Sequence, residues 1–211
     1  MEQTQASRRI WRVEERLNAF VEASFEQAME LTKDVSAAAA LTDTECKAFW
    51  EQCMAVRMGG LVVEVGSQYG RSSSLILQAA GLRGYHNIYI DPYVADDRGA
   101  SNILASWATM MHSINLPFTL LCMKTEEAQW ELDRLCRDGI DLAFIDGDHE
   151  GPAVATDMQM VASRIKSGGV MMCHDYTHPH FLGLREAVDS FTASGWTKEG
   201  QYDSLGIWRR Q

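Results

Sequence analysis

Short apolar runs that end in glycine-rich or acidic turns recur along the chain and predict a buried parallel sheet. The first run, Leu61–Val65, is rich in β-branched residues and stops at Gly66, which is typical of a buried strand that ends in a turn. Beyond Gly70, Ser72 and Ser73 precede an apolar run and predict a helix that one of these serines caps. Four further runs predict strands over residues 86–91, 118–123, 142–145 and 168–173.

The segment before the first strand has a helical pattern. Residues 7–58 are expected to be mostly helix, because apolar side chains recur at spacings of three and four. Thr42 and Glu45 have the spacing of a capping box, which predicts a helix that ends at Gly59-Gly60. These helices could pack beside the sheet, cap a substrate site or form a homodimer contact, and the sequence leaves all three open. The apolar positions of the first helical stripe are Ile10, Val13, Leu17, Phe20 and Val21.

The end of the chain predicts a helix and then a hairpin. Leu184, Val188 and Phe191 mark the helix, a strand starts at 195–197, and the last strand is Leu205–Trp208. Because the connection over residues 198–204 is short and polar, the two strands are expected to pair antiparallel at the edge of the sheet. The predicted fold is therefore α/β, with an N-terminal helical extension over residues 1–60 and a domain over 61–211, packed as one compact unit.

Composition excludes several classes of function. A chain of 211 residues, 46% of them hydrophobic, suits one domain with a substantial core. The net charge of −10 argues against a nucleic-acid partner, since such binding needs an excess of Lys and Arg. Five cysteines without C-x-x-C spacing indicate reduced thiols. No apolar run has the length of a membrane span or a signal core, so we expect a cytoplasmic protein.

The turn after the first strand is the first candidate binding site. Its spacing, Gly66-x-x-x-Gly70, lacks the third glycine of a dinucleotide fingerprint and the Lys of a P-loop. Glu64 would repel a pyrophosphate but can accept hydrogen bonds from an ammonium or a hydroxyl. The stretch E-V-G-S-x-x-G-x-S-S resembles the first motif of class I methyltransferases, which use S-adenosylmethionine. A turn of this kind that holds another ligand, or none, fits the same residues.

Asp91, which follows the second strand, is the second candidate. In α/β folds that bind nucleosides, an acidic residue in this place bonds the ribose hydroxyls. An exposed aspartate before a proline turn is the plain alternative. Farther on, Trp107, Met110 and Met111 have helical spacing that is more typical of core packing than of a lid over the site. Thr125 is expected to cap the next helix.

A third group of polar residues follows two later strands. Asp146, Asp148 and His149 come after residues 142–145, and Asp175 comes after residues 168–173. If these strands are neighbours, Asp146 and Asp175 lie close together, and such a pair repels unless a proton or a cation lies between the two carboxylates. Their oxygens favour Mg²⁺ over zinc. In the alternative arrangement, one aspartate caps the next helix and the other is solvated.

These motifs occur together in a known family. The stretch F-I-D-G-D-H, then Asp157, then K-x-G-G-x-x-x-x-H-D-Y resembles the class I methyltransferases that include antibiotic-sugar O-methyltransferases and cephalosporin hydroxylase-like proteins. The resemblance covers roughly Leu61–Tyr176. It implies a Rossmann-like three-layer sandwich and a site for S-adenosylmethionine. The cofactor residues it implies are Glu64, Gly66, Ser67, Tyr69, Ser72, Asp91, Thr125, Glu126, Asp146 and His149.

The resemblance also implies a mechanism. Asp146, Asp175 and the intervening His174 would hold a divalent cation, and His149 would act as general base toward a small hydroxylated acceptor such as a sugar or a phenol. His174 departs from the metal-dependent members, which commonly carry an acidic residue there. Asp148 could orient His149 or cap a helix, and His178 is a candidate substrate contact. The alternatives are a cofactor-binding protein without transfer activity and a relative with hydroxylase-like chemistry.

Overall fold

The computed structural model describes residues 20–32, 41–93 and 100–211, with the side chains of 100–102 excepted. The chain forms two compact units, Met1–Asp34 and Val35–Gln211. In the first unit, residues 20–32 are helical, and the predicted apolar positions at 10, 13 and 17 lie outside the described residues. The second unit contains the sheet and also the helix over Asp43–Ala55, so the boundary between the units does not coincide with the one predicted at residue 60.

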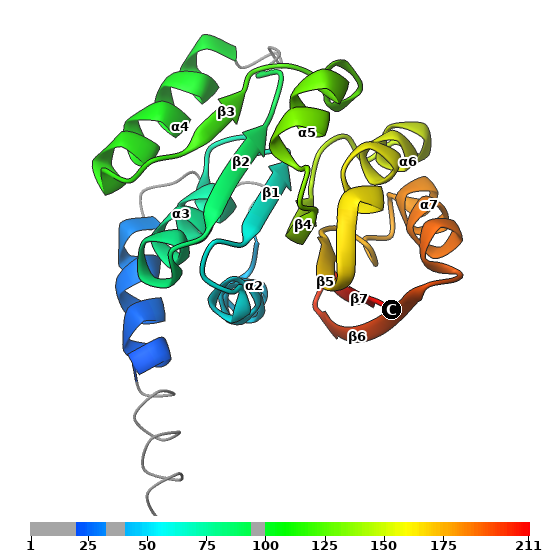
Figure 1. The fold of residues 1–211 in the computed structure, drawn as a ribbon, viewed down its shortest axis with the longest axis horizontal. Coiled ribbons are helices and arrows are strands. Elements are labelled where there is room, and N and C mark those ends of the chain that lie inside the picture. The colour runs from blue at the N-terminus through cyan, green and yellow to red at the C-terminus, as the bar shows by residue number, and fades with distance from the viewer. Residues whose placement is uncertain (1–19, 33–40, 94–99) are drawn as a thin grey trace, which may run out of the picture. The chain divides into compact units, whose positions relative to one another are not determined.

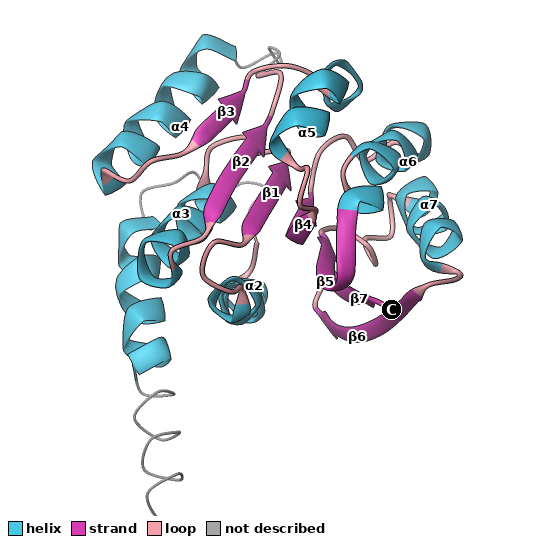
Figure 2. Cartoon of the chain, in the orientation of Figure 1, coloured by secondary structure: helices cyan, strands magenta, loops and turns pink. Residues whose placement is uncertain are grey.

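A seven-stranded sheet in the order β3-β2-β1-β4-β5-β7-β6 forms the centre of the second unit. The strands β1 to β5 pair in parallel, whereas β7 runs antiparallel to both β5 and β6. This arrangement confirms the predicted α/β class and the edge hairpin (Figure 2). The strands are β1 (Leu61–Val65), β2 (His86–Ile90), β3 (Thr119–Leu121), β4 (Ile140–Ile145), β5 (Ile165–Cys173), β6 (Trp196–Tyr202) and β7 (Leu205–Arg210).

Helices cover both faces of this sheet and make the predicted three layers. Figure 1 shows α3 and α4 on one side of the sheet and α5, α6 and α7 on the other. The rings of Phe49 in α2 and Phe144 in β4 lie 4.7 Å apart, and Tyr89 in β2 contacts Trp107 in α4 at 5.5 Å. The helices are α2 (Asp43–Ala55), α3 (Arg71–Arg83), α4 (Ala100–Ile114), α5 (Gln129–Leu135), α6 (Gly151–Met160) and α7 (Leu182–Thr192).

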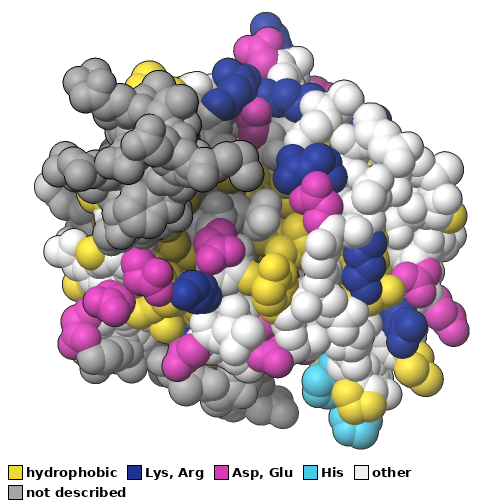
Figure 3. All heavy atoms as spheres, turned by 90° about the horizontal axis from the view of Figure 1, so that it is seen from below, with side chains coloured by type: hydrophobic (Ala, Val, Ile, Leu, Met, Phe, Trp, Pro, Cys, Tyr) yellow, Lys and Arg dark blue, Asp and Glu magenta, His cyan; other side chains and the backbone are white. Residues whose placement is uncertain are grey.

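Of the three residues predicted as core, Trp107 and Met111 are buried and Met110 is half-buried. All five cysteines are free; four are buried and Cys122 is exposed. Within the described residues, no helix combines the length and the apolar character needed to cross a membrane. On the face seen in Figure 3, Lys and Arg side chains lie among Asp and Glu side chains rather than in one basic area.

The predicted helix ends are confirmed in one case and wrong in three others. Thr42 and Glu45 form the capping box of α2, but this helix ends at Ala55, short of the two glycines. The N-cap of α3 is Gly70, without a side-chain hydrogen bond. Neither serine caps α3; the Ser73 hydroxyl donates to Glu64, nine residues earlier. Thr125 does not cap α5, because α5 begins only at Gln129, after a short 3₁₀ turn over Thr125–Glu127.

The hairpin is tighter than predicted. Strand β6 continues to Tyr202, so the connection is two residues, Asp203 and Ser204, instead of the seven expected. Asp203 has a positive φ of 48°, which a two-residue hairpin turn requires. Polar residues at 198–202 hid this strand, because it is the exposed edge of the sheet and lacks an apolar run.

Candidate active site

One pocket, of about 750 Å³, opens where β1, β2, β4 and β5 end. Parallel sheets place their ligands at this edge, and the topology brings the three predicted groups together there. Most of the predicted site residues line the pocket: Gly66, Ser67, Tyr69, Ser72, Asp91, Thr125, Glu126, Asp146, His149, His174 and Asp175.

The glycine turn is shaped by close backbone packing. Gly66 has a φ of +83°, and a Cβ atom there would lie 2.0 Å from the carbonyl oxygen of Asp146. A side chain is therefore excluded by the turn that follows β4, before any ligand is considered. Gly70 has a φ of +93°, and its Cβ would lie 2.9 Å from the ring of Trp107. Both glycines allow the turn to lie against its neighbours.

Asp91 is held firmly at the pocket wall. Its Oδ2 accepts hydrogen bonds from the backbone N–H groups of Ser67 (2.8 Å) and Gln68 (2.9 Å), and its Oδ1 accepts from Tyr93 N–H at 2.6 Å. A carboxylate has about four acceptor positions. The side chain that would bond a ribose is thus also the one that orients the glycine turn.

Glu64, predicted to contact the cofactor, does not reach the pocket wall. Its side chain is fully buried, and its Oε2 accepts hydrogen bonds from the hydroxyls of Ser67 (2.9 Å) and Ser73. Burial raises the pKa of this carboxyl to about 7, although the serine hydroxyls oppose the rise. Glu64 therefore supports the glycine turn through Ser67 and Ser73, and its direct contact with a cofactor stays a prediction.

Thr125 and Glu126 lie on the pocket wall beside a second buried carboxyl, Asp157. Thr125 is buried and Glu126 exposed. Burial raises the pKa of Asp157 to about 6, and a hydrogen bond with Thr125 opposes that rise. Sequence analysis noted Asp157 only as part of a motif, and the structure places it in the site.

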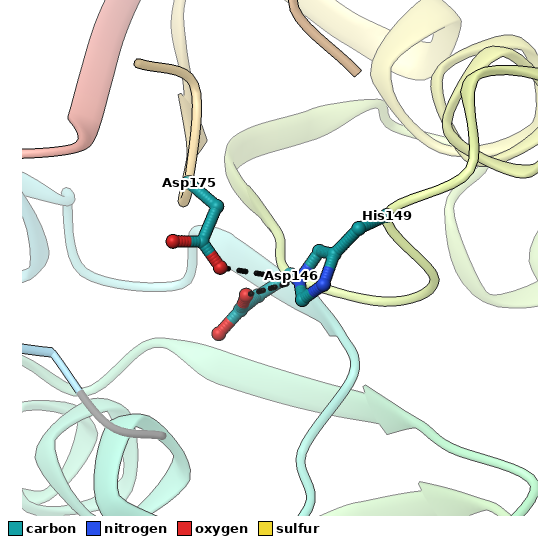
Figure 4. Close-up of side chains that lie close together, drawn as sticks. All are labelled: Asp146, His149 and Asp175. Atoms are coloured by element: carbon teal, nitrogen blue, oxygen red, sulfur yellow. Dashed lines mark ion pairs between the residues drawn. The ribbon is translucent and has the colours of Figure 1, made fainter. Parts of the chain in front are cut away.

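Four side chains at the other end of the pocket form a ring of alternating nitrogen and oxygen atoms. His149 Nε2 lies 3.7 Å from Asp146 Oδ1 and 3.3 Å from Asp175 Oδ2. His174 Nδ1 lies 3.1 Å from the same Asp146 oxygen and 3.6 Å from the same Asp175 oxygen. Figure 4 shows the imidazole of His149 beside both carboxylates. His174 and, when it is protonated, His149 thus provide the positive charge that the carboxylate pair needs.

Glu45 holds the outer side of this ring. It is 1% exposed, and its Oε2 lies 3.4 Å from His174 Nε2. Its carboxylate also accepts hydrogen bonds from Thr42 N–H, Ser204 N–H and the Ser204 hydroxyl, each at 2.8 Å. Sequence analysis missed Glu45 and Ser204 as site residues; the capping-box pattern was the only signal at Glu45, and it indicates a helix end.

The charges of these groups reinforce one another. Burial lowers the pKa of His174, but Asp146 and Glu45 outweigh burial and raise it to about 11. Burial raises the pKa of Glu45, but hydrogen bonds from His174, Thr42 and Ser204 lower it to about 2. Contact with Asp146 raises the pKa of His149, although burial alone would lower it. The charge of His174 lowers the pKa of Asp146, although burial alone would raise it.

The residues present do not fit the predicted Mg²⁺ site well. Asp146, His149 and Asp175 can each bring one ligand atom within 4.8 Å of the others. The predicted ligand His174 is not in this group. Both of its nitrogens face carboxylates, and a doubly protonated imidazole has no lone pair for a metal. Its positive charge also lies against one oxygen of Asp146 and one oxygen of Asp175.

The remaining candidates flank His149. Asp148 Oδ1 accepts a hydrogen bond from Glu150 N–H at 3.0 Å, so it caps the turn before α6 and does not orient His149. The ring of Phe181 lies 4.3 Å from that of His149 and 4.6 Å from that of His178. These three rings form an aromatic wall at this end of the pocket.

Comparisons with known proteins agree with the fold. A family described as a methyltransferase domain matches residues 63–176, whereas a comparison with curated proteins finds no significant match. Solved structures with a similar fold include NovP, an O-methyltransferase (16% identity, TM-score 0.65, 92% of this chain and 99% of that one).

Two further similar structures are named for their reactions or ligands. TomG is an O-methyltransferase of tomaymycin synthesis from Streptomyces achromogenes, solved with S-adenosylmethionine (14% identity, TM-score 0.64, 89% of each chain). CalS11 is a TDP-rhamnose 3'-O-methyltransferase of calicheamicin biosynthesis (12% identity, TM-score 0.63, 89% of this chain and 93% of that one). At these identities the likeness concerns the fold. The family match covers more than half of the 211 residues, and the chain therefore belongs to the methyltransferase domain family and has the class I fold.

Proposed function

We propose that this protein transfers a methyl group from S-adenosylmethionine to a hydroxyl group of a small acceptor. The observation that carries the proposal is a single pocket that joins a nucleoside-type wall at Asp91 to a proton-accepting group at His149. The first feature suits the cofactor and the second suits an acceptor whose hydroxyl must lose a proton. The family match supports methyl transfer, and the fold shared with TomG supports this cofactor.

The cofactor end of the pocket has the chemistry that this molecule needs. Asp91 keeps about one acceptor position, on Oδ1, for a ribose hydroxyl, and the turn from Ser67 to Gly70 offers backbone groups to the amino-acid end. Thr125 and Glu126 would lie beside the adenine. S-adenosylmethionine carries no phosphate, so the acidic character of this wall is not a penalty and favours a sulfonium.

The acceptor end of the pocket can move a proton. When bound, S-adenosylmethionine supplies a methyl group that its sulfonium has already activated. The chain has to orient the acceptor oxygen and take its proton. His149 Nε2 is buried toward the carboxylates, while the side chain stays 32% exposed. With a proton on Nε2, the other ring nitrogen, Nδ1, is the base, and Asp146 and Asp175 stabilise the imidazolium that results.

Calorimetric titration with S-adenosylhomocysteine tests the cofactor assignment. We expect a micromolar Kd, on the order of 8 kcal/mol, for the wild-type protein. Asp91→Asn should weaken binding by about tenfold or more, because the amide has one acceptor oxygen and cannot serve both the glycine turn and a ribose hydroxyl. Asp138→Asn, which changes an exposed aspartate outside this pocket, is the matched control and should leave the Kd unchanged. A folded wild-type protein that does not bind the compound would contradict the proposal.

A further inference from the structure

We infer that the acceptor end of this pocket carries its own cation: His174, held by Glu45, replaces a divalent metal between Asp146 and Asp175, and methyl transfer here is metal-independent. The inference rests on the proposed function, because it concerns the same acceptor site. It assigns to His174 and Glu45 a positioning role that the sequence pattern did not give them.

The geometry of the four-residue ring argues against a bound metal. One oxygen of Asp146 and one of Asp175 are each within 3.7 Å of both His149 Nε2 and His174 Nδ1. Because each already faces two imidazole nitrogens, a cation could approach them only by displacing a histidine or by lying against a positive charge.

The charge of His174 also argues against a bound metal. Its side chain is 8% exposed, and both nitrogens face carboxylates, with Glu45 on one side and the aspartate pair on the other. An imidazole between acceptors on both sides must donate from both nitrogens, and only the protonated form can do so. His174 is thus a fixed cation and carries no lone pair for a metal.

The hydrogen bonds of Glu45 keep His174 in its place. Three hydrogen bonds of 2.8 Å hold the Glu45 carboxylate to Thr42 and Ser204, so it cannot turn away from His174 without breaking contacts to the cap of its own helix and to the β6–β7 turn. A buried carboxylate that is fixed in this way keeps the imidazole charged and oriented. The site therefore has a counter-ion for its own cation.

Calorimetric titration with MnCl₂ and with MgCl₂ tests the inference on the protein bound to S-adenosylhomocysteine. We expect no saturable binding to the wild-type protein, and no change in its S-adenosylhomocysteine affinity after treatment with EDTA. His174→Glu should create a cation site, because it replaces the fixed charge with a third carboxylate. Since this change places two carboxylates together, Glu45→Gln/His174→Glu is the second variant, in which the amide can donate to the new side chain.

His178→Glu is the matched control, because it adds a carboxylate to the same wall but leaves the ring intact. It should bind no cation. Saturable cation binding by the wild-type protein that Asp146→Asn abolishes would overturn the inference. So would the absence of binding in both the single and the double variant, since the charge of His174 would then not be what excludes a metal. Failure of the wild-type protein to bind S-adenosylhomocysteine would instead contradict the proposed function, and the cation titrations without that compound would still report on the ring.

Discussion

His149 and His174 face the same two carboxylate oxygens, yet their surroundings assign them different roles. His174 is enclosed and bonded on both sides, whereas the side chain of His149 is 32% exposed and reaches the pocket. A group that exchanges protons with a substrate needs access, and a fixed charge does not. We therefore assign the proton transfer to His149.

The substitution His149→Ala should lower kcat by about 10²- to 10⁴-fold, the usual contribution of a general base. The Kd for S-adenosylhomocysteine should change little, because Asp91 and the glycine turn hold the cofactor. Transfer of a labelled methyl group to a panel of sugars and phenols measures kcat, and calorimetry measures the Kd. Full turnover by this variant with its acceptor would exclude His149 as the base.

The pH dependence of the rate follows from the same contact. Contact with Asp146 raises the pKa of His149 above its ordinary value of 6.5, despite burial. A base acts only in its unprotonated form, so the rate should rise with pH through a pKa above 6.5 and then level off. A rate that is flat across this range, with chemistry shown to be rate-limiting, would argue against a histidine base.

Gly66 and Gly168 have similar backbone angles. Substitutions at these two turn positions therefore separate the cost of backbone strain from the cost of close packing. Gly66 (φ +83°) would place a Cβ 2.0 Å from a backbone oxygen, whereas Gly168 (φ +78°) has open space. Gly168→Ala should cost about 1–2 kcal/mol, the penalty of a left-handed conformation. Gly66→Ala should cost more, about 3 kcal/mol or beyond, and should also abolish cofactor binding. Urea unfolding measures the free energy of unfolding of both variants. Equal losses of stability would contradict the packing argument.

Most elements of the fold were predictable because their signals are local. Strand β1 and its neighbours are apolar runs, and the candidate carboxylates follow their carboxyl ends, where a parallel sheet must bring them together. The caps at Ser73 and Thr125 were not predictable, because partners distant in sequence determine what these side chains do. Ser73 has a good capping sequence, but its hydroxyl is taken by Glu64 of β1.

At the level of the whole molecule, the acceptor site depends on contacts across most of the sequence. Glu45 and Ser204 are 159 residues apart, and both contribute to the position of His174. No pattern in the sequence pairs a helix cap with a hairpin turn, which is why sequence analysis predicted His174 as a metal ligand and overlooked Glu45. The sequence shows that His174 stands where metal-dependent relatives commonly carry an acidic residue, but it does not show that Glu45 is the partner of His174.

This buried pair should be measurable in the pH dependence of stability. His174 has a pKa of about 11 in the folded protein and about 6.5 when unfolded, so its contribution is complete below pH 6.5 and is lost as pH rises toward 11. Glu45 has a pKa of about 2 in the folded protein, against an ordinary value of 4.5. Its contribution to stability is therefore complete above pH 4.5 and is lost as pH falls toward 2.

Urea unfolding at neutral and alkaline pH should therefore show the wild-type free energy of unfolding falling with pH, with His174 contributing up to about 1.4 kcal/mol per pH unit. His174→Gln should remove that part of the slope. An unchanged slope in a folded variant would mean that His174 is not charged in the native protein.

The contact between Trp107 and the glycine turn gives the protein an optical reporter of its own. Trp107 is 1% exposed, its ring edge would meet any side chain at Gly70, and its Nε1 donates to the Ser73 hydroxyl at 3.0 Å. Indole emission responds to the polarity and hydrogen bonding of its surroundings, so occupation of the turn should shift the fluorescence spectrum without any label. With Trp107→Phe as the reference for the other five tryptophans, ligands can be screened in solution before a single acceptor is known.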